Sequence, residues 1–540
     1  MSRLPFLPRR AALGLAGAAA LPRFAIGQSD TRPSITVAVQ KISNSNTLEP
    51  LREQSNPGQR VFSLYGETLI DIDWLGSLGL QPRLAESWRR IDDRTLEMTL
   101  RQGVKFHNGA TMTVEDVAFT FSQERMWTGA TAGQPAFLTS NTAGANTKLP
   151  PQEVPVMARS SFPAFERIEI VNAHTVRFVN KTPDPTLEGR MTRNTATIYS
   201  QRAWNEAPSW LDWARKTIAT GPYRIRDYRP DVELVFEAHD EYWGGRPPLK
   251  TIRLIEVPET SSRTNGLLAG DYDFACDLPP DQIGTIDRST RHHVVGGPIA
   301  NIRLTAFDKH HAVLANPLVR RAMSHSVDRK AIVDALWYGR TNVPEGLQWP
   351  FFGPMLLADY KGPEFDLKLA ADLLKQAGYK GEEIPYQSLN NYYTNQTATA
   401  QVLTEGWRLA GLNVVIEMKE NFGQVLAPGP RRGICDNSVS AWFPDPVSAL
   451  ALYGPGGQVW QTGQWKNDEA ATTLTALQTE MDLAKRRVLY RRMLTLTERE
   501  DPAYIMLHQN GTFTGKRRDT GWKAAASFVM DFRATNWARG

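Results

Sequence analysis

The chain has little cysteine, and none of its hydrophobic runs is long enough to cross a membrane. Two of its 540 residues are cysteines, Cys276 and Cys435, which excludes a disulfide-rich scaffold. A single disulfide and two buried thiols both remain open. The apolar run at residues 11–21 is about half of the roughly 20 residues that a membrane-spanning helix needs. The composition is therefore that of an ordinary soluble protein.

Sequence signatures of the common enzyme classes are also absent. The chain contains none of the motifs G-x-S-x-G, H-E-x-x-H, G-x-G-x-x-G, G-x-x-x-x-G-K-[ST] or C-x-x-C. Catalysis by paired carboxylates stays open, because spacing along the chain does not report spacing in the fold. These absences count modestly against an enzyme, and an exported enzyme, such as a hydrolase, stays an alternative.

An excess of charge of one sign is lacking too. The formal charge is +5, but residues 1–27 contain four arginines and no acidic residue, so the remainder is near neutral. No electrostatic feature predicts nucleic acid or an anionic membrane surface as a partner. A length of 540 residues exceeds what one hydrophobic core usually serves, so two or three domains are expected.

Residues 1–27 have the pattern of a cleaved export signal. Arg9 and Arg10 precede the apolar run, and Ala25 and Gly27 place small residues before a cleavage site ahead of Gln28. The arginine pair resembles a twin-arginine signal, with an ordinary secretory signal as the alternative. No cysteine lies near the cleavage site, so a lipoprotein is not expected. We predict a free protein in the periplasm.

Hydrophobic periodicity predicts a mixture of strands and helices. Strands are expected at residues 35–39, 95–101, 221–238 and 251–257, with a hairpin at 167–179. Helices are expected after the N-caps Asn316 and Asp366, and in the segment that ends at Gly411. Residues 135–163 are polar and are predicted to form a loop. This mixture favours α/β lobes.

The stretch most like a catalytic motif, residues 100–123, is explained by architecture. Asn108 and Gly109 form a pair suited to a turn with positive φ. Thr113 and Asp116 have the spacing of a capping box. The helix that follows would bury one stripe, made of Val114, Val117, Ala118 and Phe121. We therefore predict no catalytic residue in this stretch.

The histidines do not predict a metal site or a cofactor. His107 has no second ligand at chelating spacing, so it is expected to flank a turn. The adjacent pairs His292-His293 and His310-His311 would point to opposite faces if they were on strands, and are expected on loops or the surface.

Six segments in order resemble one protein family across nearly the whole mature chain. They are PRLAESWRRIDDRTLEMTLRQGVKFHNGATMTVEDVAFTF, TGPYRIRDY, GDYDFACDLPPDQ, NPLVRRAMSHSVDRKAIVDALWYGR, AADLLKQAGY and SAWFPDP. In this order the segments resemble the family 5 solute-binding proteins of ABC importers, which take up peptides, nickel chelates, opines and some sugars. The resemblance implies an α/β, two-lobed periplasmic-binding-protein type II fold with a small inserted domain and two hinge strands.

The resemblance also implies a division into domains. The first domain would be discontinuous, at 30–73, 196–276 and 508–540, and the inserted second domain would span 74–195. The third domain, which forms the second lobe, would span 277–507. The hinge strands are expected at 274–280 and 504–511.

By the same resemblance the ligand site would centre on the segment SAWFPDP. Trp442 and Asp445 match a tryptophan and an aspartate that pairs with the α-ammonium of a peptide, and the backbone of Ala441 and Phe443 would hold the first residue of the ligand. Relatives often carry a second, structural acid a few residues further on. If three residues are missing here, Asp445 matches that second acid and the amine anchor is absent.

Further candidates come from the second lobe. Trp349, Tyr392 and Tyr393 could form aromatic walls, with core packing as the alternative. Arg431 and Arg432 could meet a carboxylate of the ligand, with a solvated loop as the alternative.

These observations predict a non-enzymatic receptor without a metal or cofactor. It would bind a small molecule or short peptide between its lobes and deliver it to the ABC permease complex, acting as a monomer. The alternatives within the same fold are a nickel chelate, an oligosaccharide or an opine.

Overall fold

The computed structural model describes residues 30–129, 142–390 and 392–537, so the predicted signal at 1–27 lies outside the described residues. One ten-stranded mixed sheet runs through the molecule in the order β14-β13-β15-β12-β16-β11-β1-β10-β9-β8. Its strands are β1 (Ser34–Val39), β8 (Tyr223–Arg229), β9 (Glu233–Ala238), β10 (Thr251–Glu256), β11 (Phe274–Ala275), β12 (His292–Phe307), β13 (Glu383–Ser388), β14 (Asn413–Met418), β15 (Ile434–Ser440) and β16 (Tyr504–Arg517).

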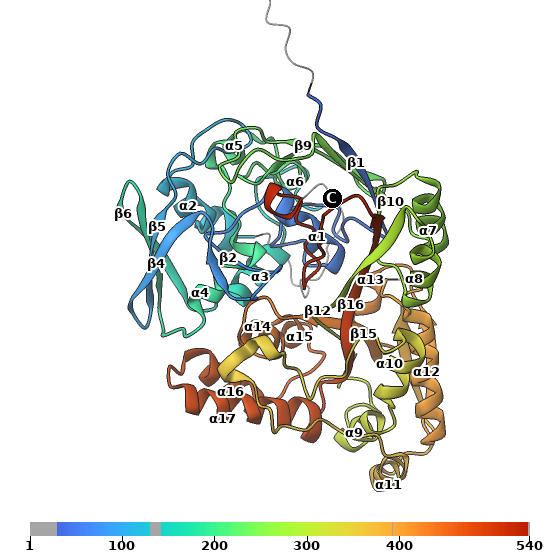
Figure 1. The fold of residues 1–540 in the computed structure, drawn as a ribbon. Coiled ribbons are helices and arrows are strands. Elements are labelled where there is room, and N and C mark those ends of the chain that lie inside the picture. The colour runs from blue at the N-terminus through green and yellow to red at the C-terminus, as the bar shows by residue number, and fades with distance from the viewer. Residues whose placement is uncertain (1–29, 130–141, 391, 538–540) are drawn as a thin grey trace, which may run out of the picture.

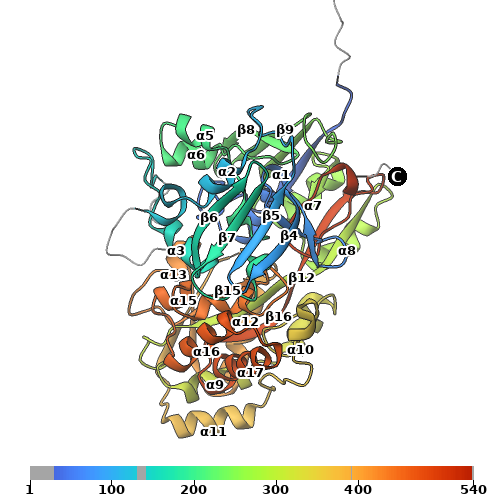
Figure 2. The ribbon, with the colours of Figure 1, turned by 90° about the vertical axis from the view of Figure 1, so that its left-hand side faces the viewer.

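Strands β12 and β16 join two lobes, as Figures 1 and 2 show. They pair antiparallel from His292↔Arg517 to Ala306↔Tyr504, with a register shift between Pro298 and Ile302. On one side of this shift β16 pairs with β11, and on the other β12 pairs with β15. The predicted arrangement of two lobes joined by two strands is confirmed.

The position of one hinge strand was predicted wrongly. The expected segment 504–511 lies within β16, but 274–280 contains only the short strand β11 and the start of α8 (Pro280–Asp287). The strand that pairs along β16 is β12, whose 16 residues span both halves of the sheet. The Gly and Pro residues at 296–298 interrupt the alternation of apolar and polar residues, so the periodicity did not predict this long strand.

A separate four-stranded sheet forms the inserted region. Its order is β4-β5-β7-β6, with strands β4 (Ala85–Asp92), β5 (Thr95–Leu100), β6 (Phe165–Asn172) and β7 (Thr175–Asn180). The hairpin β2 (Ile70–Ile72) and β3 (Leu80–Pro82) leads into it. Figure 1 shows this sheet beside the first lobe, away from β12 and β16.

Helices cover both lobes. Those of the first half are α1 (Asn56–Tyr65), α2 (Val114–Thr120), α3 (Glu153–Ser161), α4 (Leu187–Arg190), α5 (Gln201–Glu206), α6 (Trp210–Arg215), α7 (Thr260–Ala269) and α8. Those of the second half are α9 (Pro317–His325), α10 (Arg329–Trp337), α11 (Leu367–Ala377), α12 (Gln396–Leu409), α13 (Phe422–Leu426), α14 (Val447–Leu450), α15 (Gln458–Gln461), α16 (Asp468–Thr479) and α17 (Leu483–Leu494). Within the described ranges, no helix combines the length and apolarity needed to cross a membrane.

Four hydrophobic cores hold these elements. One combines buried residues from 35–65, 223–276 and 522–532. A second covers 51–219 and includes Trp204, Trp210 and Trp213, so residues 196–219 pack with the inserted sheet although the expected boundary lies at 195. The remaining two cores fill the second lobe and its junction with α7 and α8.

The capping box and the turn predicted within residues 100–123 are confirmed. Thr113 caps α2, and its backbone N–H donates to Asp116 Oδ2 over 3.0 Å in a capping box. Gly109 has φ +82° at the predicted turn. His107 is buried and bonds through Nε2 to the carbonyl of Gly221 at 3.0 Å, so it packs beside the predicted turn.

The predicted loop at 135–163 was wrong at its end. Residues 153–161 form α3, although Pro155 lies in its first turn, where a missing N–H costs no helical hydrogen bond. Val154, Ala158 and Phe162 bury one side of this segment in the inserted core. Residues 135–141 of the expected loop lie outside the described residues.

Candidate functional site

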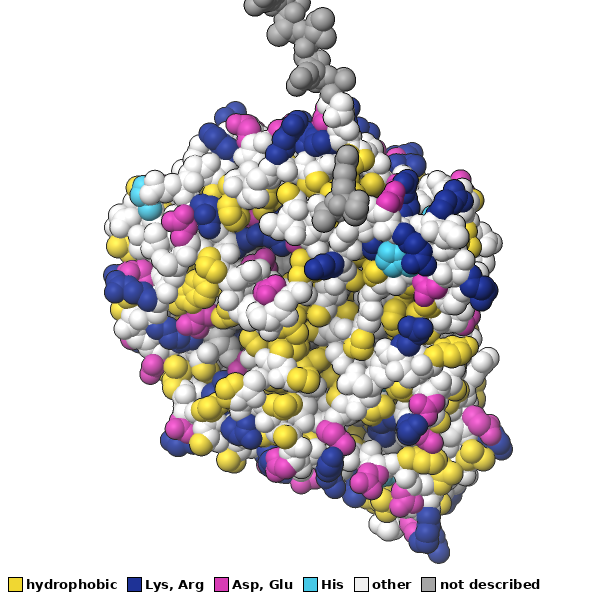
Figure 3. All heavy atoms as spheres, viewed as in Figure 1, with side chains coloured by type: hydrophobic (Ala, Val, Ile, Leu, Met, Phe, Trp, Pro, Cys, Tyr) yellow, Lys and Arg dark blue, Asp and Glu magenta, His cyan; other side chains and the backbone are white. Residues whose placement is uncertain are grey.

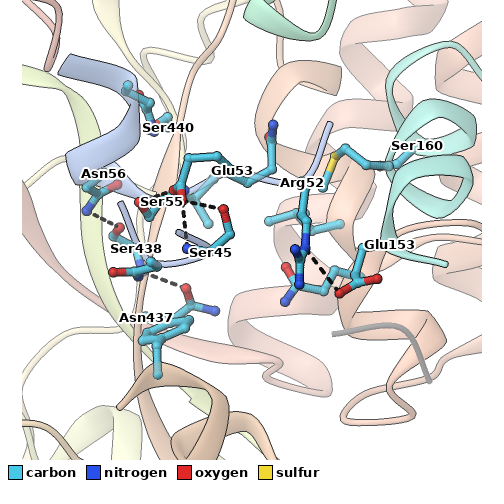
Figure 4. A pocket seen from close by; sticks show the side chains of 18 of the residues that line it. Ser45, Arg52, Glu53, Ser55, Asn56, Glu153, Ser160, Asn437, Ser438 and Ser440 are labelled. Atoms are coloured by element: carbon cyan, nitrogen blue, oxygen red, sulfur yellow. Dashed lines mark hydrogen bonds and ion pairs between the residues drawn. The ribbon is translucent and has the colours of Figure 1, made fainter. Parts of the chain in front are cut away.

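A cavity of about 160 Å³ lies between the two lobes, where roughly ten water molecules would fit. The first lobe and the inserted region contribute the segment before α1 and one face of α3, and the second lobe contributes aromatic residues and the end of β15. Its polar lining includes Asn44, Ser45, Arg52, Glu53, Ser55, Asn56, Gln59, Glu153, Ser160, Asn437, Ser438 and Ser440. Figure 4 shows most of these side chains around the cavity.

Glu53 is a buried carboxylate held by neutral donors. It accepts hydrogen bonds from the hydroxyl of Ser43 and from both the backbone N–H and the hydroxyl of Ser45 and Ser55. Figure 4 shows Glu53 turned toward Ser45 and Ser55. These bonds use both carboxylate oxygens of Glu53 and hold its side chain at the wall of the cavity.

Arg52 and Glu153 bring opposite charges to the other side of the cavity. Their closest approach, between Arg52 Nε and Glu153 Oε1, is 3.6 Å, and the guanidinium also lies over the ring of Trp210. Burial lowers the pKa of Arg52, and the nearby carboxylates of Glu153 and Glu53 partly offset this effect. This ion pair links α3 to the segment before α1 and so holds together two parts of the cavity wall.

Direct contacts across the cavity show that the lobes are closed. The Asn56 side chain at the start of α1 donates to the Ser438 hydroxyl at 3.2 Å, and the Asn56 N–H donates to the Tyr392 hydroxyl at 3.3 Å. Tyr392 and Tyr393 contact each other edge to face, with centroids 4.7 Å apart. Burial raises the pKa of Tyr392 well above its ordinary value, so this hydroxyl stays neutral.

A second, smaller cavity lies on the other side of Trp442. It is lined by Thr192 and Asn194 of the inserted region, by Ala441, and by residues of the first lobe near Trp74. Trp442 lines both cavities. Its carbonyl accepts a hydrogen bond from the Thr192 hydroxyl at 3.4 Å, which is another contact between the lobes.

Three of the predicted aromatic residues line the first cavity, namely Trp442, Tyr392 and Tyr393. Trp349 does not, because it is 1% exposed and packs against Phe352 in the core of the second lobe. Trp349 therefore packs in the core, which was the alternative given for it.

One backbone group of each residue expected to hold a ligand is already used inside the protein. The Ala441 N–H donates to the carbonyl of Ala300 at 2.9 Å, and the Phe443 carbonyl accepts from the N–H of Asp445 at 2.7 Å. Ala441 lines the smaller cavity, whereas the ring of Phe443 is buried against Gly189 of α4.

The predicted charged residues have protein partners. Asp445 is buried and forms a bidentate pair with Arg486 of α17, at 2.8 and 2.9 Å. Arg432 is buried and pairs with Asp308. The neighbouring Arg431 lies on the surface and pairs with Glu383 and Glu417. None of these three lines either cavity.

No metal centre is evident in the described part of the chain, where no group of three or more His, Cys, Asp or Glu side chains has the geometry to hold an ion. Cys276 and Cys435 are both buried free thiols, which decides the question that the sequence left open. On the face shown in Figure 3, positive and negative side chains are interspersed.

Sequence reasoning missed most of the cavity. Glu53, Arg52 and Asn56 belong to a loop and a helix start that carry no motif, and Glu153 and Ser160 are on the helix that was predicted as a loop. One signal was available: six serines and asparagines within 43–56 form a polar cluster without an obvious structural reason.

The fold and the site define a class, a two-lobed binding protein with a solute cavity at the closure of its lobes. Residues 79–461 match the model of bacterial extracellular solute-binding proteins, family 5, and the chain belongs to this family. Its members bind solutes for transport, so the protein is a binding protein and not an enzyme.

Individual relatives agree with this assignment. The chain is 27% identical to heme-binding protein A of Haemophilus influenzae over 56% of its own length and 55% of that protein. It is 25% identical to di/tripeptide-binding protein 3 of Pseudomonas aeruginosa over 85% of each chain. The fold matches the dipeptide-binding protein of a Pseudoalteromonas species in complex with Met-Leu, with a TM-score of 0.79, 21% identity, and coverage of 94% of this chain and 100% of the other.

Proposed function

We propose that this protein is the periplasmic receptor of an ABC importer, that it captures a small peptide-like solute in the cavity between its lobes, and that it presents the closed form to the permease. The observation that carries this proposal is the cavity itself, whose walls come from both lobes and meet in direct hydrogen bonds. Contacts from both lobes exist only in the closed form, so ligand binding shifts the equilibrium toward closure.

The size and lining of the cavity support a small, polar ligand. Room for roughly ten waters suits a solute of dipeptide size more than an extended oligomer. The amide and hydroxyl side chains at the end of β15 offer hydrogen bonds in the way that a peptide backbone requires.

A second candidate within the same fold is a solute without an α-ammonium, such as an opine or a nickel chelate. The observation that favours it is the Asp445–Arg486 pair, because a carboxylate already neutralised by arginine is a poor anchor for an amine. This supports the alignment in which Asp445 matches the structural acid of relatives.

Native mass spectrometry of protein purified from periplasm without refolding tests the proposal. A bound mass that matches a short peptide is expected, and a chelate or opine mass would favour the second candidate. The same spectrum gives the mass of the mature chain, which should begin at Gln28, and its oligomeric state, which should be a monomer. The proposed function would be contradicted if no solute binds, or if a bound solute does not close the lobes.

A further inference from the structure

An open groove of about 620 Å³ lies beside the hinge strands, outside the cleft between the lobes. One wall is residues 293–298 of β12, and the other is the end of β16 with the segment 518–526 that follows it. The groove shares no lining residue with either of the two cavities between the lobes. It is therefore a separate place where a ligand could bind.

The charged side chains that line this groove are all basic. They are Lys516, Arg518 and Lys523, and His293 lines the groove with them. No Asp or Glu is part of the lining. The groove thus has the charge that attracts an anion.

Lys516 is buried and lacks an acidic partner. It is 3% exposed, and its ammonium donates to the carbonyls of Arg517, at 3.4 Å, and of Thr520. Within residues 30–129, 142–390 and 392–537 no carboxylate forms an ion pair with it, and burial lowers its pKa. A buried ammonium without a counter-ion is costly, so an anion beside Lys516 would stabilise the protein.

His293 offers a directed hydrogen bond on the same side of the sheet. It lies directly opposite Lys516 in the antiparallel pairing of β12 and β16, so the two side chains project to one face. Its Nδ1 is buried without a hydrogen-bond partner. Burial and the charges of Lys516 and Arg518 lower the pKa of His293, so the ring is neutral at pH 7 and can donate from Nδ1.

Two carboxylates act on these groups from outside the groove, and both have other partners. Asp519 pairs with Arg517 at 2.5 Å, and it offsets part of the effect of burial on the pKa of Lys516. Asp287 accepts a hydrogen bond from the N–H of Val294 at 2.8 Å. An excess of positive charge therefore remains along the groove.

The groove also has free space in front of β12. Gly297 is part of its lining, and a Cβ added to this residue would meet no atom within 4 Å. An anion could therefore enter without displacing a side chain at this point.

We propose that this groove binds a small oxyanion of the phosphate type. Lys516, Arg518 and Lys523 would supply the charge, and Nδ1 of His293 would donate a hydrogen bond to an oxygen of the anion. Three cationic groups suit a phosphate, whose charge at pH 7 is close to −2, more than a singly charged carboxylate. The site goes beyond the proposed function, because no residue of the groove lines the cleft.

Isothermal titration of inorganic phosphate into the ligand-free protein at constant ionic strength is the first test. The wild type should bind one phosphate per chain. Lys516→Met and Lys523→Gln should each weaken this binding about tenfold or more, because each removes one charged donor. Lys523 is exposed, so its variant tests the site even if Lys516→Met does not fold.

A matched control separates a built site from a general effect of charge. Lys368→Gln removes an exposed lysine of α11 in the second lobe and changes the net charge by the same amount as Lys523→Gln. Its phosphate affinity should equal that of the wild type. The inference is overturned if Lys523→Gln binds phosphate as well as the wild type does, or if Lys368→Gln loses as much affinity as Lys523→Gln.

Free phosphate and the phosphate of a lipid headgroup present the same chemistry, and co-sedimentation with phosphatidylglycerol vesicles distinguishes them. Phosphate binding without vesicle binding identifies the free anion as the ligand. Vesicle binding that inorganic phosphate displaces and Lys523→Gln abolishes identifies the headgroup. Absence of both kinds of binding in the wild type overturns the site. Solute binding in the cleft should be the same in Lys523→Gln and the wild type, so failure of this site leaves the proposed function in place.

Discussion

Asp445 and Arg486 form a buried ion pair whose removal separates a structural carboxylate from one that binds ligand. The side chains are 11% and 7% exposed, and both guanidinium nitrogens contact the carboxylate at 2.8 and 2.9 Å. Asp445→Ala leaves Arg486 buried without a counter-ion, which costs about 3–5 kcal/mol in comparable pairs. For a unit the size of the second lobe this corresponds to a decrease in Tm of the order of 10 °C.

The assay is urea unfolding of the ligand-free protein, followed by titration with the ligand found by native mass spectrometry. Asp445→Ala should lower the urea midpoint, and the folded fraction should keep its ligand affinity within about twofold. Asp359→Ala is the matched control. Asp359 pairs on the surface with Arg491, which lies on α17 as Arg486 does, so the loss of this pair should leave the urea midpoint almost unchanged.

A double variant tests the cause of the instability. Asp445→Leu combined with Arg486→Met removes both charges and keeps similar volumes, so it should recover most of the stability that Asp445→Ala loses. The reasoning is refuted if Asp445→Ala keeps its urea midpoint and loses tenfold or more in ligand affinity, since Asp445 would then be the amine anchor.

Three other predictions follow from buried groups. Burial lowers the pKa of His107 to about 3, so the stability that the neutral imidazole contributes is present above pH 6.5 and is lost as pH falls toward 3. The loss is about 1.4 kcal/mol per pH unit. Urea midpoints measured from pH 7 to 4.5 should show this slope, and His107→Gln should reduce it. Gly189→Ala should hold the cleft open and weaken ligand binding, because a Cβ there would lie 2.7 Å from the ring of Phe443; small-angle scattering with ligand should show the larger radius. Burial raises the thiol pKa of Cys276 to about 11 and of Cys435 to about 12, so iodoacetamide should label neither thiol in the folded protein and both in urea.

Controls for these predictions are available in the same chain. Gly284→Ala in α8 adds a Cβ whose nearest neighbour is 3.8 Å away, so it should leave closure unchanged. If Gly189→Ala with ligand has the same radius in small-angle scattering as the wild type, the contact between Gly189 and Phe443 does not control closure. A pH profile identical in His107→Gln and the wild type would show that other groups set the slope, and a native mass lower by two hydrogens would reveal a disulfide.

The local elements were predictable because their causes lie within a few residues. The capping box of Thr113 and Asp116, the caps Asn316 and Asp366, and the strand at 35–39 all appear in the structure as expected. The long strand β12 and the helix α3 were not predicted, because packing in the sheet and in the inserted core overrides their local composition.

The sequence by itself determined the class of protein, since ordered segments of local pattern suffice to specify two α/β lobes and the family. Only the tertiary structure decided which polar groups face the cavity between the lobes. Asp445 lies in a buried ion pair because Arg486, 41 residues later, reaches it through the interior. Whether a charge is satisfied depends on distances in space and on burial, and neither is written in the spacing of residues along the chain.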